Sequence, residues 1–245
     1  GRADTLTRLW ELTNTRFIFG ASDPNFLKSL SAQLDCGQNR FRVQTAFDLV
    51  PKPGVSQATR LDQVTVATNA TGEFALIEFT GALPRAKLFT NWLTSTNDAE
   101  VLNLLTNAIF KPHDTVIVSA ALPPPSGPGT SSGTASFLSY EPKRIRLEAT
   151  AVAPSVLLLN DKHSPNWNVT VDGQPAPLLR CNYLMRGVQV PSGKHVIEFR
   201  YQPPITGLYI TSATLVLGLG LLGFVLCSRQ QATAPAEPQN LPPVK

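Results

Sequence analysis

The sequence has few of the residues that usually build metal sites and nucleophilic active sites. It has three cysteines and three histidines in 245 residues, far apart from one another, with no CxxC, HExxH or mixed Cys/His pattern. The DxD motif is also absent. We therefore expect no metal site and no cofactor within this chain.

Charged residues are also sparse, at 16% of the chain, and the net charge is only +4. The basic residues are scattered along the sequence instead of lying on one periodic stripe, so nucleic acid is not an expected partner. Proline is frequent, at 21 residues, which argues against long helices outside a few windows.

The N-terminal end has no apolar run of the kind found in a signal peptide. Residues 1–20 include Asp4, Glu11 and three arginines. An exported domain would therefore need sequence upstream of Gly1, and otherwise the domain would stay inside the cell. Cys36 and Cys181 could pair if the domain lies outside the cytoplasm, and two unpaired thiols fit the sequence equally well.

One long apolar segment, Ile205 to Cys227, has no charged residue, which predicts a transmembrane helix over residues 204–228. Gly207, Thr211, Thr214 and Gly218 share one face, and small residues of this kind let helices pack closely in lipid. Neighbouring membrane helices are therefore expected. The Pro- and Ala-rich residues 229–245 are expected to form a disordered tail.

The remaining pattern predicts a mainly β chain with some α (α+β). We expect a mixed α/β region over residues 1–135 and a small β-sandwich over residues 136–203, where short alternating strands recur. The expected helices cover residues 5–13, 25–34 and 98–110. The expected strands cover residues 16–20, 41–50, 64–68, 74–80, 84–93, 115–119, 144–151, 155–160, 167–171, 183–190 and 195–201. A loop is expected over residues 122–136.

The most suggestive polar cluster surrounds Trp167, because an aromatic ring beside polar groups can act as a platform for a sugar. The candidate substrate-binding residues are Asp161, His163, Trp167, Tyr183 and Arg186. The alternative is a loop between strands whose tryptophan closes the end of the sandwich. Arg186 could equally be a solvated strand residue.

The second half of the chain resembles the C-terminal region of the bacterial YfhO-like membrane proteins. The resemblance rests on the segments EPKRIRLEATA, LLLNDKHSPNW and VDGQPAPLLRCNYLMRGVQVPSGKHVIEFRYQP, followed by the apolar segment. Weaker upstream matches are LWELTNTRFIF, LPRAKLF and NDAEVLNLL. This sequence has Pro165-Asn166-Trp167 where the family usually has Pro-Gly-Trp.

The resemblance implies a glycosyltransferase-like protein of the GT-C type that uses lipid-linked sugar for cell-envelope glycosylation. It implies that this chain is the extracytoplasmic C-terminal domain and the last helix, with the catalytic part and further helices upstream. The implied partners are the bilayer, those helices, and lipid-linked sugar or envelope glycan. The implied location is the bacterial cell membrane, with a short cytoplasmic tail.

Two other interpretations remain open from the residues. The chain could be a non-enzymatic, membrane-tethered β-sandwich that binds glycan or a partner protein. It could also be a tail-anchored protein that faces the cytoplasm, because the basic residues on the two sides of the helix are nearly balanced.

Overall fold

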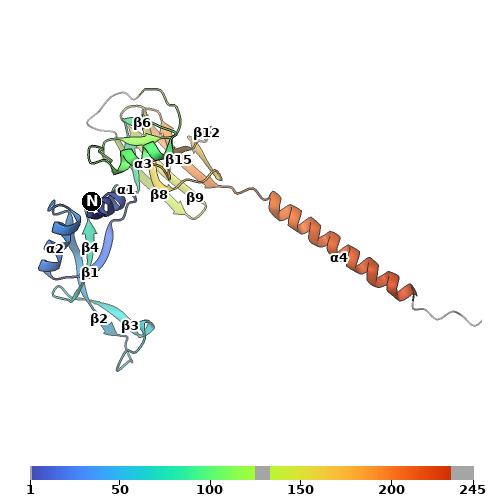
Figure 1. Cartoon of the computed structure of the whole chain (residues 1–245), viewed down its shortest axis with the longest axis horizontal. Helices are drawn as coiled ribbons and strands as arrows, with labels where there is room; N and C mark the ends of the chain where they lie inside the picture. The colour runs from blue at the N-terminus through green and yellow to red at the C-terminus, as the bar shows by residue number, and fades with distance from the viewer. Residues whose placement is uncertain (1, 125–132, 233–245) are drawn as a thin grey trace, which may run out of the picture. The chain divides into compact units, whose positions relative to one another are not determined.

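A computed structural model describes residues 2–124 and 133–232 (Figure 1). The chain divides into two compact units, Gly1–Tyr201 and Gln202–Lys245. The first unit contains three β-sheets and three α-helices, and the second contains one long helix within the described residues. The mainly β fold with a C-terminal apolar helix is therefore confirmed.

The N-terminal part of the first unit is a four-stranded antiparallel sheet, in the order β1-β4-β2-β3, with two helices on one face. Ala75, Ile77 and Phe79 alternate along β4 and are fully buried against these helices. Asp23 caps the second helix and Pro24 occupies its first position, as the sequence predicts. The elements are α1 (Arg2–Leu12), β1 (Phe17–Ala21), α2 (Pro24–Leu34), β2 (Phe41–Pro51), η1 (Leu61–Gln63), β3 (Val64–Thr68) and β4 (Phe74–Phe79).

The second sheet has six strands in the order β5-β10-β14-β13-β7-β6. Its first and last strands, β5 and β6, are joined only by Thr90 and Asn91. Such a link spans about 10 Å, whereas the edges of a flat six-stranded sheet lie about 24 Å apart. The sheet must therefore curl until its edges approach each other. The strands are β5 (Ala86–Phe89), β6 (Trp92–Thr94), β7 (Val116–Val118), β10 (Ser155–Lys162), β13 (Leu179–Cys181) and β14 (Met185–Val190).

The third sheet, which we call the outer sheet, is antiparallel, in the order β12-β11-β15-β9-β8. It packs on the curled sheet to form the sandwich. Leu147 and Phe199 from this sheet meet Leu157 and Val188 from the curled sheet in one buried cluster. Asp172-Gly173 makes the predicted tight turn between β11 and β12, with both residues at positive φ. The strands are β8 (Gly133–Glu141), β9 (Arg144–Ala151), β11 (Trp167–Val171), β12 (Gln174–Ala176) and β15 (Gly193–Tyr201).

Several expected elements differ in their bounds. Residues 84–93 form two strands, β5 and β6, on opposite edges of the curled sheet instead of one strand. Gly133 to Ser136 were expected in a loop but begin β8, which pairs with β9 along its length. The sandwich also includes β5, β6 and β7, which precede residue 136. Residues 125–132 of the expected loop lie outside the described residues.

The third helix, α3 (Asp98–Thr106), is capped by Asn97 as predicted but ends four residues earlier than expected. The side chain of Asn107 accepts a hydrogen bond from the backbone N–H of Ile109, a local turn that competes with helix continuation. Ile109, expected on the apolar face of the helix, is consequently 83% exposed.

The second unit contains α4 (Thr206–Ala232), in which Thr206–Val225 is long and apolar enough to cross a membrane. The helix continues through residues 229–232, which were expected in the disordered tail, because Arg229, Gln230, Gln231 and Ala232 have good helix propensity. The remaining tail, residues 233–245, lies outside the described residues.

Candidate functional site

Arg186 is the buried centre of the candidate site, at 3% exposure. It lies in β14, whose other buried residues are apolar or glycine. Its Nη2 donates to Oδ2 of Asp161 at 2.9 Å, and its Nη1 donates to the Lys162 carbonyl at 3.1 Å. Burial lowers the pKa of Arg186, and the charge of Asp161 opposes this shift. Within the described residues, its Nε has no hydrogen-bond partner.

Asp161 accepts hydrogen bonds from three side chains, which lie in or next to three different strands. Besides Arg186, it accepts from Arg85, whose Nη2 lies 2.9 Å from Oδ1, and from the Tyr140 hydroxyl at 3.1 Å. Arg85 also donates to the Tyr140 oxygen and lies over the Tyr140 ring. The pairing of β10 with β14 shifts register between Leu159 and Lys162, and such a bulge re-aims nearby side chains.

The Arg186 guanidinium stacks on the indole of Trp167, with its carbon 3.8 Å from the ring centroid. Trp167 also packs against the core between the sheets and against Tyr201. Trp167, the first residue of β11, thus packs against the core of the sandwich and also lines a cavity. One face of its ring is occupied by the guanidinium, so a ligand would meet the rest of the indole.

The cavity beside this cluster has a volume of about 400 Å³. Its polar groups are two carboxylates, two cations, a hydroxyl and a phenol, and its apolar walls include the indole. This mixture can orient a small polar ligand through hydrogen bonds while an aromatic surface contacts its apolar side. The lining residues are Tyr140, Glu141, Pro142, Ile145, Asp161, Lys162, Ser164, Trp167 and Arg186.

Of the five residues predicted from the sequence, Asp161, Trp167 and Arg186 come together at this cavity. His163 lies outside the lining, where burial and then the charges of Arg180 and Arg186 lower its pKa. Tyr183 instead packs against the core beside α3. The predicted site thus has a centre of three residues, and two of the five lie elsewhere.

Sequence reasoning missed Arg85, Tyr140 and Glu141. Arg85 and Tyr140 reach Asp161 only through tertiary packing, and Tyr140 lies in β8, for which no strand was expected. The stretch Phe137 to Tyr140 has no apolar–polar alternation that would predict a strand, and the pairing of β8 with β9 shifts register between Phe137 and Ser139.

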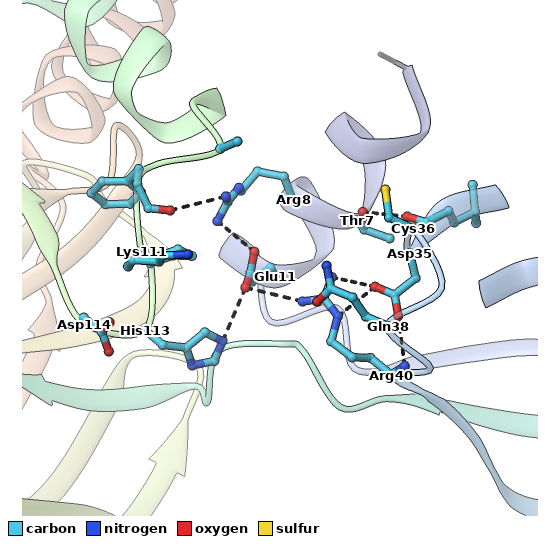
Figure 2. Close-up of a pocket in the computed structure, with 14 residues that line it drawn as sticks. Thr7, Arg8, Glu11, Asp35, Cys36, Gln38, Arg40, Lys111, His113 and Asp114 are labelled. Carbon is cyan, nitrogen blue, oxygen red and sulfur yellow. Dashed lines mark hydrogen bonds and ion pairs between the residues drawn. The ribbon is translucent and has the colours of Figure 1, made fainter. Parts of the chain in front are cut away.

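A second polar cluster joins the N-terminal helix α1 to the loop after α3 (Figure 2). Glu11 lies at its centre and pairs with Arg8 at 2.9 Å and with Arg40 and His113 at 3.6 Å each. Asp35 holds Arg40 from the other side at 2.6 Å. The cluster borders a cavity of about 390 Å³. Its side chains are mutually paired, so it links the N-terminal sheet to the sandwich.

Cys181 is a buried free thiol in the described part of the chain, so it does not form the disulfide with Cys36 that the sequence left open. Burial raises the pKa of this thiol. Within the same residues, no group of three or more histidine, cysteine, aspartate or glutamate side chains is arranged to hold a metal ion.

A β-sandwich followed by a helix that is long and apolar enough to cross a bilayer supports a membrane-associated protein. Residues 136–212 match the family model of the bacterial membrane protein YfhO, and this region of the chain is YfhO-like. The match runs from β8 to the first turns of α4 and includes the Arg186 cavity. Neither the curated proteins nor the solved structures compared with the chain give a match.

Proposed function

We propose that the unit before α4 is the extracytoplasmic sugar-binding domain of a glycosyltransferase-like membrane protein. In this proposal the protein uses lipid-linked sugar for cell-envelope glycosylation, and the domain helps to shape the donor or acceptor site. Support comes from the YfhO-like region, which contains both the cavity and the start of the membrane helix.

The observation that carries the proposal is the burial of Arg186 at the wall of the cavity. A guanidinium buried this deeply is costly unless it is paired, and Asp161 and Trp167 hold it in one orientation. The Asp161 carboxylate, the Tyr140 phenol and the Ser164 hydroxyl add further polar groups to the lining. Sugar hydroxyls both donate and accept hydrogen bonds, so they match such a set of groups.

The same cavity also supports the alternative of a non-enzymatic, membrane-tethered module that binds glycan. The two functions differ in whether sugar transfer depends on the cavity. In both, α4 would hold the domain at a bilayer, where its effective concentration toward membrane-linked glycans is high.

The test compares Arg186→Lys with wild type in two measurements. Binding is measured with the full chain in nanodiscs on an array of bacterial envelope glycans. Transfer is measured in membranes from cells that express the open reading frame containing this chain, with radiolabelled lipid-linked sugar. Arg146→Lys, on the outer face of β9 and 43% exposed, is the matched control.

We expect Arg186→Lys to lower both binding and transfer at least about tenfold, because a lysine cannot replace the planar hydrogen-bonding fork of arginine. The control should change neither. Lost binding with unchanged transfer would favour the alternative module. Unchanged binding and unchanged transfer would contradict both functions.

A further inference from the structure

A row of charged side chains crosses the N-terminal sheet where β1, β4 and β2 lie side by side. Glu78 of β4 lies opposite Phe17 of β1 and opposite Arg42 of β2. Arg16 immediately precedes Phe17, so the two arginines approach Glu78 from opposite sides. Neither arginine belongs to the Arg186 cluster described above.

Both arginines bind the same carboxylate side-on. Nε and Nη2 of Arg16 lie 2.7 and 2.6 Å from Oε1 of Glu78, and the same atoms of Arg42 each lie 2.6 Å from Oε2. The hydrogen bonds from Arg16 and then Arg42 lower the pKa of Glu78. The carboxylate is thus ionised at neutral pH, and one positive charge of the row is left without a negative partner.

Exposure differs sharply along this row. The side chain of Glu78 is 3% exposed, whereas those of Arg16 and Arg42 are 57% and 63% exposed. The carboxylate therefore lies beneath the two guanidinium groups, and the excess positive charge faces outward. An ion pair that served only the sheet would need one arginine to neutralise Glu78, so the second arginine requires another explanation.

These side chains line a cavity of about 760 Å³, and Arg85 forms another part of its wall. Arg85 uses Nε and Nη2 to hold Asp161 of the neighbouring Arg186 cluster. In the described part of the chain, the Nη1 atoms of Arg16, Arg42 and Arg85 make no hydrogen bond or ion pair. Three guanidinium groups therefore have unused donors around one cavity.

We propose that Arg16, Arg42 and Arg85 form a binding site for a phosphate-type oxyanion, with Glu78 and Asp161 fixing the orientation of the guanidinium groups. Planar guanidinium groups pair with tetrahedral oxyanions through charge-assisted hydrogen bonds. Among the residues that line the cavity, three arginines exceed the one carboxylate, Glu78, by two charges, which matches a phosphate group. The phosphate can be the phosphomonoester headgroup of an anionic lipid such as phosphatidic acid, or it can belong to a soluble molecule; the zwitterionic phosphodiester of phosphatidylcholine does not match the charge of the site.

The experiment uses the full chain in nanodiscs, and the readout is the unfolding temperature of the unit before α4. In one arm, nanodiscs of phosphatidylcholine are titrated with inorganic phosphate, with chloride at equal ionic strength as the reference. In the other arm, phosphatidic acid replaces part of the phosphatidylcholine. Arg42→Gln and Arg85→Gln are the test variants, and Arg60→Gln is the control because Arg60 is exposed and pairs with Asp62 outside the cavity.

We expect a saturable rise in unfolding temperature that either test variant weakens about tenfold in apparent affinity and that the control retains. A rise with inorganic phosphate identifies a soluble phosphate as sufficient, and a rise only with phosphatidic acid identifies a headgroup. If Arg42→Gln does not fold, the Arg85→Gln variant alone tests the proposal, because Arg85 forms no ion pair with Glu78. A response in neither arm, or an equal response in the test variants and the control, would overturn the proposal.

Discussion

Arg186 and Trp167 form a stacked pair at the end of the sandwich, with the guanidinium carbon 3.8 Å from the ring centroid. The pair joins β14 of the curled sheet to β11 of the outer sheet, and Phe199 of β15 lies beneath the same guanidinium at 5.7 Å. A charged group therefore contributes to the contact between the two sheets, beside the packing of Trp167 on the apolar core. The same group lines the adjacent cavity.

The buried ion pair gives a first prediction. Arg186→Met should destabilise the unit by about 3 kcal/mol, because Asp161 would lose its most buried partner and retain only the more exposed Arg85 and Tyr140. Urea unfolding measures the loss. The Asp161→Asn, Arg186→Met double variant should recover part of the lost unfolding free energy. If the losses of the two single variants simply add in the double variant, the direct coupling of Asp161 and Arg186 is contradicted.

Strand β10 is buried on both faces, so truncation of adjacent side chains along it should lower the free energy of unfolding by similar amounts. Leu157 faces the outer sheet and Leu158 faces the interior of the curled sheet, and each is fully buried. Replacing either by alanine should cost about 2–5 kcal/mol. Thr150→Ala on β9, at an exposed position, should change stability by less than about 0.5 kcal/mol. A cost at only one of the two leucines would contradict the curled sheet.

Gly187 lies where β14 passes closest to its neighbours. A Cβ at this position would lie 2.6 Å from the Leu157 carbonyl oxygen and 2.7 Å from the sulfur of Cys181. Gly187→Ala should therefore destabilise the unit by about 1–3 kcal/mol through overpacking. Gly207→Ala in α4, with open space around it, should leave the unfolding of the sandwich unchanged. Equal unfolding curves for both variants would contradict the close packing.

The contact between His195 and Asp172 predicts a pH dependence. Nδ1 of His195 lies 2.6 Å from Oδ2 of Asp172, and this hydrogen bond raises the pKa of His195 and lowers that of Asp172. Stability from the raised histidine pKa is present below its unfolded value and is lost as pH rises through the folded value. Stability from the lowered aspartate pKa is present above its unfolded value and is lost as pH falls through the folded value. The pair therefore stabilises most between about pH 4 and pH 6.5.

The measurement for this pair is the difference in unfolding free energy between wild type and Asp172→Asn across pH. A difference is needed because the lowered pKa of His163 acts in the opposite direction, so that its stabilisation is lost as pH falls. The difference should be larger at pH 5 than at pH 8. A difference that is constant with pH would contradict the ion pair.

The outer sheet could be predicted from the sequence because its strands carry their own signals. The alternation Ile145, Leu147, Ala149 in β9 buries every second residue, and Asp172-Gly173 fixes the next turn. The curled sheet could not be predicted in the same way. Its strands β6, β7 and β13 are only three residues long, which is too short for an alternation of apolar and polar residues to be recognised in the sequence.

The candidate site was predictable only where its residues are neighbours in the sequence. Asp161 and Trp167 lie close together along the chain, so their proximity in space follows from one short connection. The partners Arg85 and Tyr140 reach Asp161 from positions 76 and 21 residues earlier in the chain. Their contact depends on how the curled sheet meets the outer sheet, which local sequence pattern does not encode.

A sugar-binding role in cell-envelope glycosylation requires that the unit before α4 face the extracytoplasmic side. Cys36 is exposed and Cys181 is buried, so Cys36 reports the side on which the unit lies. The most direct measurement is labelling of the full chain in intact cells with a membrane-impermeant thiol reagent, with Cys36→Ser as the control for other cysteines. The account predicts labelling in intact cells that Cys36→Ser removes. Labelling of Cys36 only after permeabilisation would contradict it.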